Sequence, residues 1–384
     1  MNSRERVITS VSHKEPDRVP FDFGGTYVTG ITKIPYKELL EFIGKNSNNI
    51  ALEHVACQIV VVDEVVQEEF DADVRGVFDD TLPEEEMATA DDGKYLYFID
   101  DWGTKWKKPK IGGFYYDMCD YPLKCADLSD LEQMKWPNPV NIERFKKLTN
   151  KAKKIYEQGK YYIALGGCGM TPGYLSAIAF AMGFENAFIA IATDSIFTNT
   201  FLDKMEALEI KFWENFLPMA GKWLDMVMFT DDFAGQNGLL ISKDMFTKYF
   251  KNRYKRLFLK IKKLAPHIKI FFHSCGGIYD IIEDLIEIGV DILNPVQISA
   301  KGMNIGKIKK EFGNDIVIWG AGIDTQNTLP KGTPNEVKME VKTNIETLAK
   351  NGGFVFSAVH NIQPGVPPEN IIAMIDAVKE YGKY

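Results

Sequence analysis

Short apolar runs alternate with helical segments along most of this chain, and this alternation limits the folds that it can form. Eight runs are nearly continuous in apolar residues, as parallel strands covered on both faces are; they span 18–23, 58–63, 161–167, 226–232, 268–273, 292–296, 316–323 and 354–359. Apolar residues at helical spacing fill intervals at 36–43, 187–194, 245–264, 278–288 and 335–349. We therefore expect an α/β fold, a (β/α)8 TIM barrel formed by residues 1–384 as one domain. A doubly wound sheet is the alternative, but the strand count and the lack of a Gly-x-Gly-x-x-Gly turn argue against it.

Residues 64–158 interrupt the alternation, because they are too long for one crossover helix between the second and third strands. They contain an acidic, turn-rich patch and a hairpin pattern over 95–106. We expect an insertion that covers the barrel mouth and shapes a substrate pocket. Its aromatic residues include Tyr95, Tyr97, Trp102, Trp106, Tyr115 and Tyr116.

Composition restricts the partners of the chain. Its net charge of −8 comes with no basic stripe, which argues against nucleic-acid binding. The first residues are charged, and no apolar segment approaches the roughly 20 residues of a membrane span. Five cysteines without regular spacing are typical of a reducing compartment. We expect a cytoplasmic protein that binds neither a membrane nor nucleic acid.

Polar residues stand where the predicted strands end, and this is the edge at which barrels of this class carry their active sites. In chain order they are Asp22, Asp63, Cys168, Asp231, Asp232, His273, Cys275, Asn294, Asp324 and His360. His273 and Cys275 share one face, because side chains along a strand alternate with period two. His360 follows the last strand, which in a closed barrel lies across the mouth from His273. These three ligands would leave one position of a tetrahedral zinc site open, as catalytic zinc sites do.

Each of these residues has a structural alternative. The histidines and the cysteine can be core or loop residues that hydrogen-bond their neighbours. Asp231 and Asp232 can act as a general acid, orient a ligand histidine or cap a helix. Asp22 and Asn294 are candidates for substrate binding, and Asp324 either binds substrate or caps the following helix.

Other cysteine and histidine residues carry a weaker signal. Cys168 lies in the glycine-rich turn 166–169 and is either a spare metal ligand or a packing residue. The sequence shows no constellation for His13, His54 and His267.

Several motifs occur in a characteristic order along the chain. They are His13-Lys14-Glu15-Pro16-Asp17-Arg18-Val19-Pro20, Thr230-Asp231-Asp232-Phe233-Ala234-Gly235-Gln236, His273-Ser274-Cys275-Gly276, Gly320-Ala321-Gly322-Ile323-Asp324 and Pro367-Pro368-Glu369-Asn370-Ile371. In these motifs, over nearly its whole length, the chain resembles the uroporphyrinogen decarboxylase superfamily, and within it the zinc-dependent corrinoid methyltransferases. The resemblance implies a (β/α)8 barrel and zinc held by the His-x-Cys motif and a later cysteine. His360 stands at about the place of that cysteine, which is a departure from the family pattern.

The resemblance implies methyl transfer that involves cobalamin carried by a separate corrinoid protein. With His360 in place of a thiolate, Zn²⁺ would be a stronger Lewis acid, which favours a demethylase that takes the methyl group from an ether such as a methoxyaromatic, or from an amine. The first alternative is a methylcobalamin:thiol methyltransferase. The second is a uroporphyrinogen-type decarboxylase without metal, but residues 22–30 contain no arginine to pair the carboxylates of its substrate. Two further alternative functions are a zinc-dependent hydrolase and a metal-free binding protein with the same barrel fold.

Overall fold

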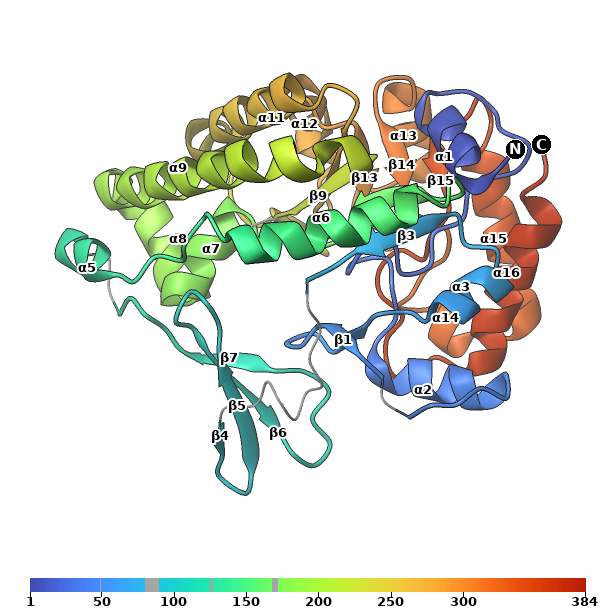
Figure 1. The fold of residues 1–384 in the computed structure, drawn as a ribbon, viewed down its shortest axis with the longest axis horizontal. Coiled ribbons are helices and arrows are strands. Elements are labelled where there is room, and N and C mark those ends of the chain that lie inside the picture. Colours follow the sequence, from blue (N-terminus) through green and yellow to red (C-terminus); the bar gives the residue numbers. More distant parts are fainter. Residues whose placement is uncertain (49, 80–89, 125–126, 168–171) are drawn as a thin grey trace.

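The protein is organised around a parallel β-sheet (Figure 1). The computed structural model describes residues 1–384 apart from 49, 80–89, 125–126 and 168–171. Among the described residues this sheet has seven strands in the spatial order β15-β14-β13-β12-β9-β8-β3. They are β3 (Val74–Val77), β8 (Tyr162–Leu165), β9 (Met226–Thr230), β12 (Lys269–His273), β13 (Ile292–Asn294), β14 (Val317–Trp319) and β15 (Phe354–Val355).

Residues 20–22 join the two edges of this sheet. Phe21 forms a parallel bridge with Phe356, just after β15, and the N–H of Asp22 donates to the carbonyl of Phe356 at 2.9 Å. On the other side the N–H of Asp73, just before β3, donates to the carbonyl of Phe21 at 2.8 Å. The first predicted strand therefore takes the eighth position and closes the sheet. The predicted (β/α)8 barrel is confirmed.

The prediction that residues 58–63 form the second barrel strand is wrong. Part of that run is β2 (Ile59–Val60), which pairs antiparallel with β1 (Leu52–His54) outside the parallel sheet. The second strand is β3, whose pattern is interrupted by Arg75 and therefore resembles a surface segment. Arg75 is nevertheless buried, because Glu64 pairs with its guanidinium at 2.9 Å and the ring of Tyr161 lies 3.6 Å from it.

Side chains of the strands alternate between the barrel interior and the helical layer. In β12, Phe271 belongs to an inner apolar cluster, whereas Ile270 and Phe272 pack in the outer core. Other strand residues in the inner cluster are Val74, Tyr162, Ala164, Met226, Met228, Ile292, Val317, Trp319 and Val355. His273 has the parity of Phe271, so it points into the barrel above this cluster.

Helix α1 (Ser3–Val11) closes the opposite, N-terminal end of the barrel. It places Val7 and Val11 in the inner cluster. Its backbone is bonded to residues that precede two strands, because Arg4 N–H donates to Lys160 O and the N–H of Gly353 donates to Ser10 O, both at 2.8 Å. Because α1 covers the N-terminal end of the barrel, a functional site is expected at the C-terminal ends of the strands.

Helices cover the outside of the barrel. They include α2 (Lys33–Phe42), α3 (Glu64–Glu69), α6 (Ile142–Tyr156), α7 (Tyr174–Met182), α8 (Phe184–Thr193), α9 (Ser195–Ala220), α11 (Asn252–Leu264), α12 (Ile282–Glu287), α13 (Ile305–Phe312), α15 (Pro334–Leu348) and α16 (Pro368–Tyr381). The predicted helical segments correspond to α2, α8, α11, α12 and α15. In the described part of the chain no single helix is long and apolar enough to cross a membrane, and α7 with α8 meets that criterion only as a pair bent by 117°.

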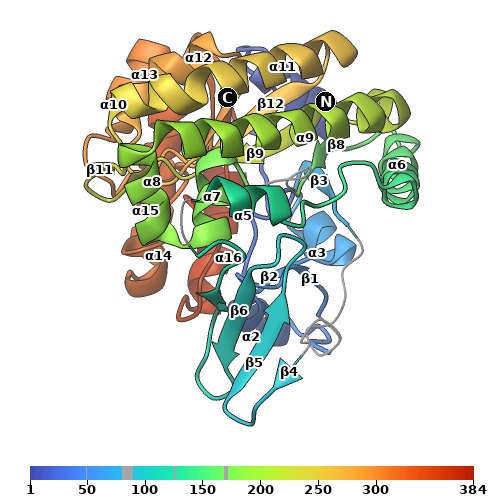
Figure 2. The ribbon, with the colours of Figure 1, turned by 90° about the vertical axis from the view of Figure 1, so that its left-hand side faces the viewer.

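The chain between β3 and β8 carries an antiparallel sheet that projects from the barrel (Figure 2). Its strands are β4 (Ala90–Asp91), β5 (Tyr95–Ile99), β6 (Lys105–Pro109) and β7 (Asp117–Asp120), followed by α5 (Leu128–Gln133). The predicted hairpin is confirmed, since Phe98 of β5 pairs with Trp106 of β6. The sheet is attached to α7, where Thr104 Oγ1 donates to the carbonyl of Phe180 at 2.8 Å.

Candidate metal centre

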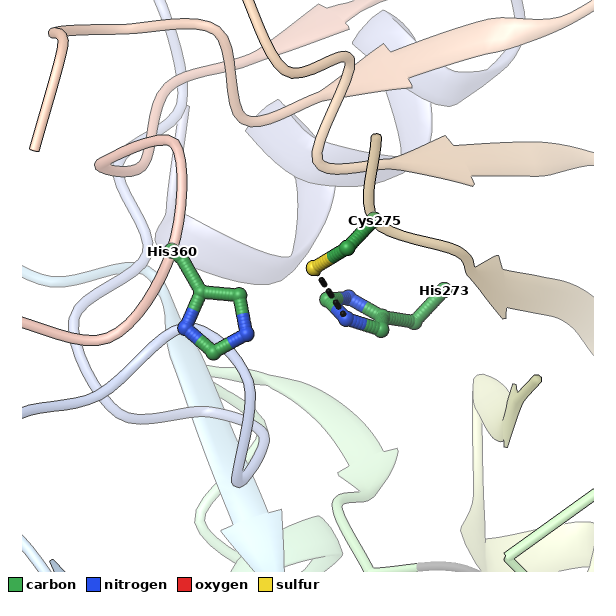
Figure 3. Close-up of side chains that lie close together, drawn as sticks. All are labelled: His273, Cys275 and His360. Atoms are coloured by element: carbon green, nitrogen blue, oxygen red, sulfur yellow. Dashed lines mark hydrogen bonds between the residues drawn. The ribbon is translucent and has the colours of Figure 1, made fainter. Parts of the chain in front are cut away.

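Three predicted ligands meet at the C-terminal end of the barrel (Figure 3). His273 is the last residue of β12, Cys275 follows it, and His360 lies in the loop after β15. One ligand atom from each side chain lies within 4.8 Å of the other two. The Sγ of Cys275 is 3.3 Å from Nε2 of His273, and the two imidazole rings are 5.3 Å apart between centroids.

The position of His273 and Cys275 is set by the strands beside β12. His273 pairs with Thr230 of β9 on one side and with Asn294 of β13 on the other. The chain then turns at Gly276, whose φ is +85°; a Cβ there would lie 2.6 Å from the carbonyl oxygen of Gly235. Only glycine fits this turn, which brings Cys275 back beside the imidazole.

The donor set fits a zinc ion. Two imidazole nitrogens and one sulfur are common zinc ligands, with Zn–N near 2.0 Å and Zn–S near 2.3 Å. A tetrahedral site with these bond lengths separates its sulfur and nitrogen ligands by about 3.5 Å. The observed separation of 3.3 Å between Cys275 and His273 is close to this value.

Asn294 fixes the orientation of the His273 ring. Its Nδ2 donates to the carbonyl of Trp319 at 2.7 Å, which leaves its Oδ1 facing Nδ1 of His273 at 2.5 Å. The imidazole therefore carries its proton on Nδ1 and presents the lone pair of Nε2 toward Cys275. A metal-bound histidine uses the same arrangement. The side chain of Asn294 is fully buried.

Burial determines the protonation of the ligands. It lowers the pKa of His273 to about 4, against which the hydrogen bond to Asn294 acts. Burial also lowers the pKa of His360 to about 4, and His273 adds to this effect. Both imidazoles are neutral at pH 7 and able to bind a metal. Burial raises the pKa of the Cys275 thiol well above its usual value, as does the nearby Asp232, so metal binding would release a proton from the sulfur.

Asp232 lies beside the three ligands. Its Oδ1 accepts the N–H of Cys275 at 2.8 Å and is 3.9 Å from Nε2 of His273. Half of its side chain, 52%, is open to solvent. Desolvation by the surrounding protein raises the pKa of this carboxyl, whereas the N–H of Cys275 and the ring of His360 lower it. A carboxyl group that can exchange a proton with solvent thus borders the ligand cluster.

Asp231 points away from the ligands. Its carboxylate accepts the N–H groups of Leu175 and Ser176, both at 2.9 Å, and the hydroxyl of Tyr254 at 2.8 Å. These contacts tie the end of β9 to the first turn of α7. The side chain is fully buried, and burial raises its pKa to about 6.

The other predicted polar residues have local partners. Asp22 is buried, where it accepts the N–H of Gly25 at 2.8 Å and Nε1 of Trp319 at 2.9 Å, and burial raises its pKa to about 6. Asp324 accepts the N–H of Gln326 at 2.7 Å in the turn that follows it. Cys168 lies outside the described residues.

The structure also shows a contact between two residues that the sequence did not connect. His54, for which no constellation was expected, lies beside Cys57, whose N–H donates to its Nδ1 at 3.2 Å. A His-x-x-Cys spacing is visible in the sequence, but it lies in a segment predicted to lead into the barrel wall. The two residues lie next to each other in the turn that joins the antiparallel strands β1 and β2.

This architecture, a (β/α)8 barrel with three side chains at its C-terminal mouth that could hold a metal ion, is that of a barrel enzyme with its candidate site at the usual end of the strands. The family model of "Uroporphyrinogen decarboxylase (URO-D)" matches residues 120–381. The chain therefore belongs to the uroporphyrinogen decarboxylase family, and the superfamily predicted from the motifs is confirmed.

Two curated relatives and one solved structure illustrate the similarity, all at low sequence identity. A uroporphyrinogen decarboxylase of Psychromonas ingrahamii is 23% identical over 81% of this chain and 79% of its own length. A uroporphyrinogen decarboxylase of Pelodictyon phaeoclathratiforme is 25% identical, but that match spans 41% of this chain and only 42% of the relative. Among solved structures, a methyltransferase from Methanosarcina mazei superimposes with a TM-score of 0.64 at 16% identity and covers 99% of both chains. This last likeness shows a shared fold.

Proposed function

We propose that this protein is a zinc-dependent methyltransferase that moves a methyl group from a small methylated ether or amine to a corrinoid protein. The observation that carries the proposal is the convergence of His273, Cys275 and His360 at the barrel mouth, beside the solvent-open carboxyl of Asp232. Bound there, Zn²⁺ would supply a Lewis acid for the heteroatom of the donor.

The ligand charges favour a demethylase. Two neutral imidazoles and one thiolate leave a net positive charge on a zinc site, whereas a second thiolate would cancel it. A positive site attracts the lone pair of an ether or amine more strongly, and it keeps a bound thiolate less nucleophilic. His360 is therefore the residue that sets the direction of transfer in this proposal.

Residues around the ligands take two roles in this reaction. When the bond from the heteroatom to the methyl carbon breaks, the heteroatom keeps the electron pair and needs a proton, and the methyl group passes to the reduced corrinoid of the partner protein. Protonated Asp232 can donate that proton and regain one from solvent. Asn294 and Asp22 keep their polar atoms on barrel partners, so we assign them to positioning of the site, and Asp231 to anchoring α7.

We expect the insertion, with its sheet β4–β7, to cover part of the barrel mouth. Its sheet is bonded to the C-terminal part of α7 through Thr104, and the N-terminal turn of α7 is bonded to Asp231 at the end of β9. At the other side, the N–H of Tyr116 donates to the carbonyl of Ala56 in the turn between β1 and β2 at 2.9 Å. Both attachments favour the C-terminal side of the barrel.

Decarboxylation is the second candidate, since the curated relatives carry that name. Its polycarboxylate substrate needs cations in the mouth, because desolvated carboxylates without partners are costly. The segment after the first strand, residues 22–30, has none.

The proposal is tested by metal analysis and by two assays of opposite direction. We expect one zinc per chain, and demethylation of a methoxyaromatic or methylamine when reduced corrinoid protein is supplied. His360→Ala should lose zinc and activity. The matched control is His267→Ala, since Nε2 of His267 bonds the carbonyls of Gly221 and Leu224, and it should keep both. Rapid methylation of thiols by methylcobalamin without any demethylation would reverse the assigned direction, and turnover of uroporphyrinogen would replace the proposal.

A further inference from the structure

A second group of reactive side chains lies in the turn between β1 and β2. Cys57 is a free, exposed cysteine, and its N–H donates to Nδ1 of His54 at 3.2 Å. The charge of His54 acts on the thiol of Cys57 and lowers its pKa. His54 is held in place by the ring of Tyr27, which stacks on it with centroids 5.2 Å apart and an angle of 19° between the planes. The backbone contact and the stacked ring therefore hold Cys57 and His54 next to each other in this turn.

This pair lies close to the candidate metal centre. The carboxylate of Asp232, which is bonded to Cys275, also acts electrostatically on the Cys57 thiol. The carbonyl of Tyr27 accepts Nδ2 of Asn361 at 2.8 Å, and Asn361 directly follows His360. The pair and the loop of His360 are thus connected through Tyr27, and the charge of Asp232 acts on the thiols of both Cys57 and Cys275.

Two neighbouring side chains, His54 and Asp232, influence the charge of Cys57. Desolvation raises the pKa of its thiol, and so does the charge of Asp232, but the charge and hydrogen bond of His54 outweigh both and hold the pKa below its usual value. Tyr115 of the insertion also faces this thiol, and the pKa of its phenol is raised by burial and by Cys57. A thiolate stabilised by a neighbouring imidazole is a form in which cysteine acts as a nucleophile.

The other described cysteines do not share these surroundings. Cys275 is a half-buried thiol whose pKa is raised, and it belongs to the candidate metal ligands. Cys119 donates its thiol proton to the carbonyl of Lys105 at 3.3 Å. Among the described residues, Cys57 alone combines an exposed position with an imidazole partner.

We propose that Cys57 is a covalent modification site at the mouth of the barrel, which takes small soft electrophiles and small disulfides, and that the adduct obstructs the metal centre. With a disulfide, the Sγ of Cys57 forms a bond to one sulfur, the sulfur–sulfur bond of the reagent breaks, and its other half leaves as a thiolate that takes a proton from solvent. Cys57 is oxidised and one equivalent of the reagent's thiol is released. The obstruction rests on the proposed metal function, whereas the modification does not.

The modification is tested on the full-length protein with iodoacetamide and peptide mass spectrometry, with Cys119 as internal reference. We expect Cys57 to react about tenfold faster than Cys119 at pH 7, and this ratio to fall at pH 9.5, where ordinary thiols ionise as well. His54→Gln should remove most of the advantage and leave Cys119 unchanged. His13→Gln is the matched control, because His13 bonds the carbonyl of Gly313 and should alter neither rate. Equal rates for the two cysteines, or a His54→Gln variant as reactive as the parent, would overturn the modification site.

The obstruction is tested with Co²⁺ alone, whose uptake by a thiolate site is followed by absorption. Protein treated with cystamine should take up Co²⁺ at least about fivefold more slowly than untreated protein, and reduction should restore the rate. Cys57→Ser should be insensitive to the treatment. Unchanged uptake in the treated parent overturns the obstruction. A protein that binds no Co²⁺ in either state contradicts the proposed metal function, whereas the labelling rates still decide independently whether Cys57 is a modification site.

Discussion

Replacement of Asn294 by alanine tests how much of the metal affinity comes from the orientation of one ligand. In the parent protein the Asn294 amide connects Nδ1 of His273 to the carbonyl of Trp319, and all three groups are buried. Without that amide, the imidazole can rotate and can place its proton on either nitrogen. The ring then presents Nε2 to the metal for only part of the time.

Two magnitudes follow from these contacts. Loss of such a partner of a ligand histidine weakens metal binding about 10–100-fold, or about 1.4–2.7 kcal/mol. The variant also leaves a buried N–H of His273 and a buried carbonyl of Trp319 unpaired, and each unpaired group costs about 1–3 kcal/mol of the free energy of unfolding. The metal-free variant is thus expected to be less stable by about 2–6 kcal/mol.

The assay is a competitive titration of zinc against a chromophoric chelator at pH 7, with urea unfolding of the metal-free protein in parallel. The matched control is Asn370→Ala, because Asn370 is a buried amide that bonds the carbonyls of Leu329 and Gly332. It should lose a comparable amount of stability and keep its zinc affinity. If Asn294→Ala binds zinc as tightly as the parent, or if both variants lose equal affinity, the orienting role is refuted.

Three further outcomes are expected. His360→Cys should still bind metal and should add a sulfur-to-metal absorption band with Co²⁺. It should also shift activity from demethylation toward thiol methylation. An unchanged ratio of the two activities would contradict the argument that the charge of the ligands sets the direction of transfer. The metal-free protein should lose stability as the pH falls from 7 to 5. The pKa values of His273 and His360 are about 4 in the folded protein and about 6.5 in the unfolded chain, so the unfolded chain binds protons first, which costs about 2 kcal/mol of the free energy of unfolding per histidine. Urea unfolding at the two pH values measures this loss, and it should be smaller for His360→Gln. Asp231→Ala should lower the free energy of unfolding by about 2–5 kcal/mol, because the buried donors at α7 lose their acceptor. The zinc affinity should not change. A large loss of zinc affinity would place Asp231 at the metal.

The sequence alone determined the barrel and the three candidate ligands. Parallel strands are buried on both faces, so their sequences are nearly continuous apolar runs. Most strands could therefore be predicted without knowing which strands they pair with. The period of two then placed His273 and Cys275 on one face, and the closure of an eight-stranded sheet placed His360 opposite them. Both inferences use only the local geometry of a strand and the symmetry of the fold.

Tertiary structure decided the pairing of strands and the partners of polar groups. The run at 58–63 is as apolar as a barrel strand, but an apolar run does not specify which strand it pairs with, and here β2 pairs with β1. In the same way, Asp231 and Asp232 are adjacent in the chain, yet one anchors α7 and the other borders the ligands. Hydrogen bonds between residues far apart in sequence, such as His273 to Asn294 or Tyr27 to Asn361, form only after the strands and loops are assembled. Their energy depends on burial, and burial is a property of the whole fold.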